Sequence, residues 1–79
     1  MDNKEKYIKA FTEVFSMDDE KVCQLKYAES SEWDSVGHMN LIAALEEAFD
    51  IMMDTDDIID LSSFVKGQEI LRERYQVEI

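Results

Sequence analysis

The chain has 79 residues, enough for one domain (1–79) with a small core but not for a deep active-site cleft. Its 19 Asp and Glu outnumber its 8 Lys and Arg, and a net charge of −11 disfavours nucleic acids and anionic membranes as partners. The single Cys23 excludes an internal disulfide, and no apolar run has the length of a membrane span, so we expect a cytoplasmic protein.

A first helix is predicted over residues 3–16. Apolar residues recur there at helical spacing and form one face, which consists of Tyr7, Ile8, Phe11, Val14 and Phe15. Residues 17–34 show no clean period and predict a long loop, which Val22, Leu25 and Tyr27 would fix to the core.

A second helix is predicted over residues 35–49. Asp34 or Ser35 would cap it, because their short side chains accept hydrogen bonds from the N–H groups of the first turn. The core face would consist of Leu41, Ile42, Leu45, Ala48 and Phe49. The opposite face carries a second apolar stripe with flanking acids, which consists of Val36, Met39, Ala43, Glu46 and Glu47. A simple surface helix does not need a second stripe, so this face indicates that a partner docks there.

Two further helices complete the prediction. Residues 55–60 form a short helix, and Ser62 or Ser63 caps a last helix that ends near Tyr75. Its inward positions are predicted to be Phe64, Gly67, Ile70, Leu71 and Tyr75. With no proline and only two glycines, the chain is predicted to be all-α, a small bundle of three longer helices and one short helix.

Negative charge is concentrated in the middle of the chain. Residues 27–65 contain no Lys or Arg but ten acids, which account for −10 of the net charge of −11. Such a field attracts basic surfaces on partner proteins and speeds their encounter. The alternative interpretation is that these acids serve solubility alone.

The second predicted helix begins with the triplet Asp34-Ser35-Val36, and residues 41–51 read LIAALEEAFDI. An acidic short helix follows at residues 56–58, and a serine-capped helix follows at residues 62–64. In these features the chain resembles the acyl carrier protein family, the phosphopantetheine-dependent carriers. The resemblance covers essentially the whole chain. An Asp-Ser pair alone is a weak signal, whereas the triplet with this helix, spacing and length is specific.

The resemblance implies a four-helix bundle of acyl-carrier type, with 4′-phosphopantetheine attached to Ser35 through a phosphodiester. The thiol of this arm would hold an acyl group as a thioester and present it to enzymes of fatty-acid, lipid or specialised biosynthesis. The chain itself would catalyse nothing. The implied partners are a phosphopantetheinyl transferase and acyl-loading or acyl-transferring enzymes with basic docking patches. The carrier would act as a monomer.

The resemblance also assigns roles to single positions. Asp34 and Ser35 would form the recognition and attachment site. The docking face would comprise Val36, Met39, Glu46 and Glu47. The acyl pocket would be lined by Ile42, Leu45, Phe49, Ile59 and Gly67. The absence of a side chain at position 67 would leave space in that pocket.

The chain departs from the carriers of bacterial fatty-acid synthesis in two places. Residues 27–33 replace the Phe-x-x-Asp-Leu-Gly-like segment that usually precedes the serine motif, and Asn40 stands where the docking face commonly has an acid. Trp33 beside the motif resembles freestanding carriers of specialised pathways. Aminoacyl and peptidyl carriers, including D-alanyl carriers, share the serine and the fold, so the cargo class stays open.

Simpler interpretations compete with these roles. Ser35 would then be an unmodified N-cap, and the chain an unmodified acidic interaction module. His38 is predicted to be packed or hydrogen-bonded rather than catalytic, because the sequence implies no triad, and Cys23 to be a small hydrophobe. The acids of residues 54–60 lack the Gly and Glu of a calcium-binding loop, so no metal site is predicted. Without a base and nucleophile set, the chain is not expected to be an enzyme.

Overall fold

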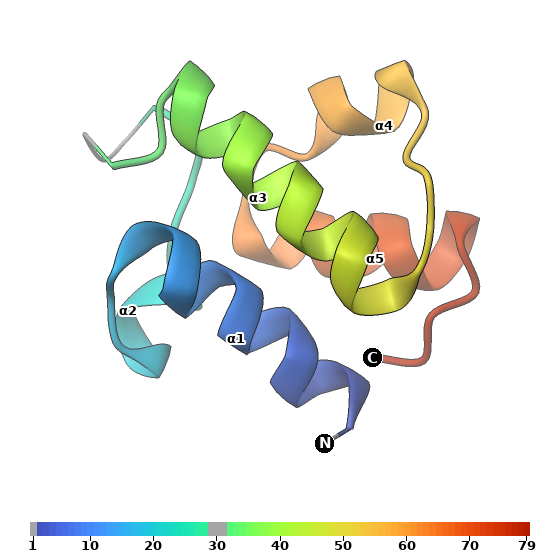
Figure 1. Cartoon of the computed structure of the whole chain (residues 1–79), viewed down its shortest axis with the longest axis horizontal. Helices are drawn as coiled ribbons and strands as arrows, with labels where there is room; N and C mark the ends of the chain where they lie inside the picture. The colour runs from blue at the N-terminus through green and yellow to red at the C-terminus, as the bar shows by residue number, and fades with distance from the viewer. Residues whose placement is uncertain (1, 29–31) are drawn as a thin grey trace.

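The computed structural model describes residues 2–28 and 32–79. Five helices lie in these ranges, namely α1 (Asn3–Phe15), α2 (Asp19–Val22), α3 (Ser35–Phe49), α4 (Thr55–Asp60) and α5 (Phe64–Arg74). They form a small all-α bundle, as predicted, in which α1 packs against α3 (Figure 1). No helix of the described ranges is long and apolar enough to cross a membrane.

Side-chain caps fix where the helices begin. The Asp2 carboxylate caps α1 by accepting the Glu5 N–H at 2.8 Å, and Ser63 caps α5 by accepting the Lys66 N–H at 2.9 Å. These bonds satisfy N–H groups that have no partner inside their own helix. The predicted bounds of α3 and α4 are confirmed. The start of α3 has a side-chain cap, whereas Asp54 before α4 makes no such bond.

The predicted loop over residues 17–34 contains one helical turn, α2, that the sequence pattern missed. A helix of four residues is too short to show a period of 3.6. Val22 and Leu25 are buried, as predicted, whereas Tyr27 stays 41% exposed. The residue that fixes the end of this segment to the core is instead Trp33, which is completely buried.

Aromatic rings form the centre of the core. The Trp33 indole packs against the rings of Phe11 and Phe15 on α1, with centroids 5.5 Å apart in both pairs. Tyr7 packs against Phe64 at the start of α5, with centroids 4.8 Å apart. The largest completely buried side chains are Trp33, Tyr7, Phe11, Leu41, Leu45, Leu61, Leu71 and Val22. Trp33 therefore anchors the segment before α3 to α1, and so positions the start of α3.

Gly37 allows the chain before α3 to lie directly against the first turn of that helix. A Cβ atom at this position would come within 2.5 Å of the Glu32 carbonyl oxygen and 3.0 Å of the Phe15 ring. A larger residue would force the two backbone segments apart. Glycine is therefore needed for the close approach that places Ser35 at the surface of the bundle.

Candidate functional site

Asp34, rather than Ser35, caps α3. Its carboxylate accepts the Gly37 N–H at 2.9 Å, and its carbonyl oxygen accepts the His38 N–H at 2.8 Å. Ser35 is the first residue inside the helix and is exposed. Its hydroxyl is therefore not needed to begin the helix, which removes the capping interpretation of this serine.

The Ser35 hydroxyl lies beside the phenol of Tyr27, with the two oxygens 3.4 Å apart. The Tyr27 backbone N–H donates to the Ser62 carbonyl oxygen at 2.8 Å, which fixes this residue to the turn before α5. The Tyr27 ring packs edge-on against the rings of Trp33 and His38, at centroid separations of 6.3 and 5.3 Å. The phenol is thus held next to Ser35 by contacts that do not involve Ser35.

His38 links the segment before α3 to α4 through two hydrogen bonds. The Trp33 indole N–H donates to His38 Nδ1 at 2.9 Å, and His38 Nε2 lies 2.7 Å from the Ile58 carbonyl oxygen. An indole N–H only donates and a carbonyl oxygen only accepts, so Nδ1 is the acceptor and Nε2 the donor in these two bonds. Both ring nitrogens are occupied, which confirms the prediction that His38 is a hydrogen-bonded residue rather than a free base.

A shallow hollow of about 370 Å³ opens beside Ser35 between α3 and α4. Its lining is Tyr27, Ser35, His38, Met39, Ile58, Ile59, Leu61 and Ser62. The exposed surface of this lining is mainly apolar, and the hydroxyls stand at the positions of Tyr27, Ser35 and Ser62. The hollow can therefore shelter a small, mostly apolar group close to the Ser35 oxygen.

The predicted docking face lies on the outer side of α3. Val36 and Met39 are 70% and 57% exposed, and Glu47 is exposed as well. Glu46 differs, because it is half-buried and its carboxylate accepts the Met53 N–H at 2.9 Å. Glu46 therefore holds the chain that follows α3, a role that the sequence pattern did not indicate.

The five residues predicted to line an acyl pocket differ in their surroundings. Ile42 and Leu45 are packed in the core, and Phe49 is half-buried against it. Of the five, Ile59 alone lines the hollow beside Ser35, and its side chain is 72% exposed. The space expected at Gly67 is filled by the Tyr7 hydroxyl, which reaches this glycine from α1. Sequence spacing could not show this, because the two residues belong to different helices.

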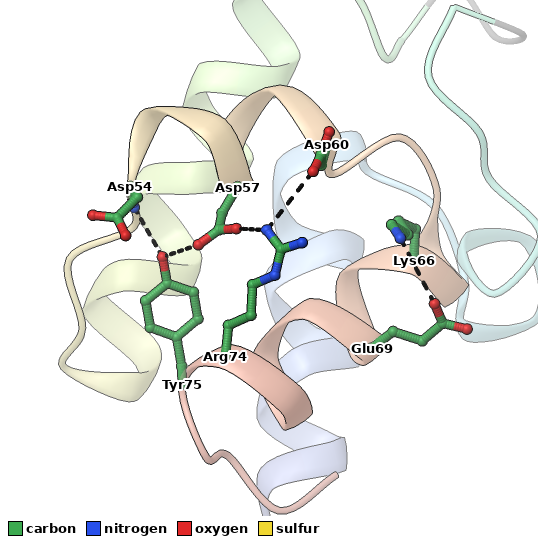
Figure 2. Close-up of polar contacts among 7 residues, drawn as sticks. All are labelled: Asp54, Asp57, Asp60, Lys66, Glu69, Arg74 and Tyr75. Atoms are coloured by element: carbon green, nitrogen blue, oxygen red, sulfur yellow. Dashed lines mark hydrogen bonds and ion pairs between the residues drawn. The ribbon is translucent and has the colours of Figure 1, made fainter.

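The end of α5 holds α4 through a network of charged and polar groups (Figure 2). The buried carboxylate of Asp57 accepts hydrogen bonds from the Arg74 guanidinium and from the Tyr75 hydroxyl, the latter at 2.5 Å. The Tyr75 oxygen in turn accepts the Asp54 N–H at 2.8 Å, and Arg74 lies 3.7 Å from the carboxylate of Asp60. We call Asp57, Arg74 and Tyr75 the α4 clamp. The sequence pattern indicated only that the acids of residues 54–60 do not form a calcium-binding loop, and it did not predict this clamp.

The α4 clamp keeps its buried carboxylate ionised. The hydrogen bond from Tyr75 is the largest influence on the pKa of Asp57, and with the Arg74 guanidinium it holds that pKa below its ordinary value despite burial. Burial, together with the bond to Asp57, raises the pKa of Tyr75. Tyr75 therefore stays a hydrogen-bond donor, and the clamp fixes the wall of the hollow that α4 supplies.

We expect Asp57→Asn to lower the free energy of unfolding by about 1–2 kcal/mol at neutral pH, a modest value because Arg74 is about half exposed. The folded-state pKa of Asp57 is depressed, so its contribution is complete above the ordinary carboxylate pKa of about 4. The contribution is lost as the pH falls through the lower folded-state pKa. Urea unfolding of both chains at neutral and acidic pH measures the difference.

The matched control for this experiment is Asp60→Asn, since Asp60 is half exposed and lies farther from Arg74. It should change stability much less than Asp57→Asn. The difference in the free energy of unfolding between the native chain and Asp57→Asn should shrink at strongly acidic pH. A constant difference from neutral to strongly acidic pH would contradict a role for the ionised Asp57.

Two other candidates lie away from Ser35. Cys23 was predicted to be a small hydrophobe, but it is exposed at the end of α2 and is not a core residue. It is the C-terminal capping residue of α2. In residues 2–28 and 32–79, no three side chains among His, Cys, Asp and Glu are grouped so that they could hold a metal ion.

The residues around Ser35 fit a covalently attached group, because its hydroxyl is exposed, is not used as a cap and adjoins the hollow. No protein-family model matches the chain, and no curated protein or solved structure matches it. A functional assignment therefore depends on these residues and on their geometry.

Proposed function

We propose that this chain is a carrier protein of acyl-carrier type, with 4′-phosphopantetheine attached to Ser35. The observation that carries the proposal is the exposed Ser35 hydroxyl on the first turn of a helix that Asp34 caps, beside the hollow between α3 and α4. A helix N-terminus accommodates an added phosphate, since its N–H groups and the positive end of its dipole face that phosphate.

The bond-forming step of attachment uses only the Ser35 hydroxyl of this chain. In the transfer, the bond between Ser35 Oγ and phosphorus forms and a pyrophosphate P–O bond of coenzyme A breaks. Adenosine 3′,5′-bisphosphate leaves, and the hydroxyl proton passes to a base of the transferase or to water. When bound, the group supplies a thiol that holds an acyl chain as a thioester. Asp34 keeps the serine on the first turn, while Val36 and Met39 offer an apolar contact surface beside it.

We predict that the native chain gains one phosphopantetheine when it is incubated with a broad-specificity phosphopantetheinyl transferase, coenzyme A and Mg²⁺. Ser35→Ala should gain none, because the attacking oxygen is missing. Intact-protein mass spectrometry measures both outcomes. The matched control is Ser62→Ala, which removes another hydroxyl of the same hollow and should leave the modification complete.

A folded native chain that gains no mass with two different transferases would contradict the carrier proposal. The exposed apolar stripe on α3 would then support the alternative, an acidic module that binds a partner without being modified. If Ser35→Ala bound that partner as well as the native chain does, the chain would be identified as such an unmodified module.

We also predict that Glu47→Lys slows modification by a basic transferase roughly tenfold at low salt, because the reversed charge weakens electrostatic steering. High salt should remove most of the difference. Glu47 is the cleaner test of the docking face, since Glu46 also bonds to the Met53 N–H. Initial rates from mass spectrometry supply the measurement.

Glu73→Lys is the matched control, because it makes the same charge change at an exposed site on α5, away from the side of α3 that carries Glu47. If both variants slowed modification equally, the rate would depend on the overall charge of the chain. The docking face would then have no part in the proposal.

The cargo is proposed to be an acyl group rather than an aminoacyl or peptidyl group. The support for this choice is the apolar lining that Met39, Ile58 and Ile59 give to the hollow beside Ser35. An α-ammonium group would gain nothing from such a lining. Loading assays with acyl-activating and amino-acid-activating enzymes separate the two classes.

A further inference from the structure

Tyr27 supplies the side chain that the structure places against the Ser35 hydroxyl. Its position does not depend on Ser35. Its backbone N–H is bound to the Ser62 carbonyl oxygen, and its ring lies edge-on to Trp33, which is completely buried. The phenol is therefore a hydroxyl donor that the fold holds in advance beside the proposed attachment point.

The contact between the two hydroxyls is longer than a typical O–H···O bond. Their oxygens lie 3.4 Å apart, compared with about 2.7–2.8 Å for most bonds of this kind. Two neutral hydroxyls this far apart gain little from each other. The donor capacity of the Tyr27 phenol is thus left for a stronger acceptor next to Ser35.

A phosphodiester on Ser35 would be such an acceptor, and it would need a donor. No Lys or Arg lines the hollow beside Ser35, and the first-turn N–H of Gly37 is already bound to the Asp34 carboxylate. The Tyr27 phenol would therefore add a side-chain donor to the backbone N–H groups at the start of α3. A phosphodiester places ionised oxygens on the phosphorus atom that is bonded to Ser35 Oγ. Hydrogen bonds from a hydroxyl to an ionised oxygen are shorter and stronger than those between neutral groups.

We infer that Tyr27 is a positioning residue for the modified form, in which its phenol donates a hydrogen bond to the phosphodiester on Ser35. This inference rests on the proposed function. The bond holds the attachment end of the arm against the mouth of the hollow that Tyr27 and Ser35 both line. The lining of this hollow contains no Lys or Arg, so the phenol is a hydroxyl donor where no cationic side chain lines the site.

The test compares the unmodified and modified forms of the native chain and of Tyr27→Phe, with modification confirmed by mass spectrometry. The ³¹P resonance of the phosphodiester should shift by more than its linewidth in Tyr27→Phe, because its hydrogen-bond donor is gone. Modification should also raise the melting temperature of the native chain more than that of Tyr27→Phe. Because each chain is compared with its own unmodified form, any effect of the substitution on the stability of the unmodified fold cancels.

Ser62→Ala serves as the matched control, because it removes a hydroxyl from the same hollow. Its modified form should keep the native ³¹P shift. Identical ³¹P shifts for the native chain and Tyr27→Phe, together with equal gains in melting temperature, would overturn the inference while the mass gain still supports the carrier proposal. A native chain that gains no mass would overturn both.

Discussion

Gly67→Ala is expected to destabilise the fold by about 2–3 kcal/mol, although alanine is the better helix former. A Cβ atom at this position would overlap the Tyr7 hydroxyl. That ring is completely buried, and its hydroxyl donates to the Phe64 carbonyl oxygen at 2.6 Å. Burial raises the pKa of Tyr7 far above its ordinary value, so the phenol stays a donor. The ring therefore cannot move aside without losing this bond.

The same substitution should cost less than about 1 kcal/mol in a Tyr7→Phe background, because the overlapping oxygen is gone. The new Cβ would then face the ring carbon of position 7 at 3.2 Å and Leu61 at 3.3 Å, which are tight contacts but not overlaps. Urea unfolding of the four chains, followed by the fluorescence of the single Trp33, measures the coupling. Equal costs in both backgrounds would show that Tyr7 does not limit this position.

Trp33→Ala is expected to lower the free energy of unfolding by about 3–5 kcal/mol, a large part of the 5–15 kcal/mol typical of small domains. The substitution empties the space against Phe11 and Phe15 and removes the N–H that His38 Nδ1 accepts. Far-UV circular dichroism during urea unfolding measures the loss, because the fluorescent residue is absent from this variant.

Trp33→Phe is the matched control, since it keeps an aromatic ring in the core and removes the indole N–H. It should cost distinctly less than Trp33→Ala. If Trp33→Ala cost less than about 1 kcal/mol, the indole would not have the buried position between α1 and α3 that the structure gives it.

The helices were largely predictable from local patterns. Asp34 and Ser63 cap their helices through bonds to residues three positions away, and the apolar periods of α1 and α3 show which faces are buried. The serine motif and the exposed stripe of Val36 and Met39 were also visible in the sequence, because a helical face is set by spacing alone. The single turn of α2 was not, since four residues cannot display a period.

The surroundings of Ser35 depended on contacts between residues far apart in the chain. Spacing could not show that Trp33 is a core residue, that Tyr27 lies against Ser35 or that His38 holds α4 through Ile58. Spacing also could not show that the space beside Gly67 is occupied, because the occupying hydroxyl comes from Tyr7 on another helix.

The sequence by itself determined the all-α class, the bounds of α3 and α4, the exposed serine motif and the acidic field, because each depends on neighbours within one or two helical turns. Only the tertiary structure decided which groups meet. Asp57 pairs with Arg74, which lies 17 residues later in the chain, and Tyr7 bonds to Phe64, which lies 57 residues later. Both pairings follow from how the helices pack. Packing depends on the whole chain, because a buried polar group needs a hydrogen-bond partner and that partner can be a residue far away in the sequence.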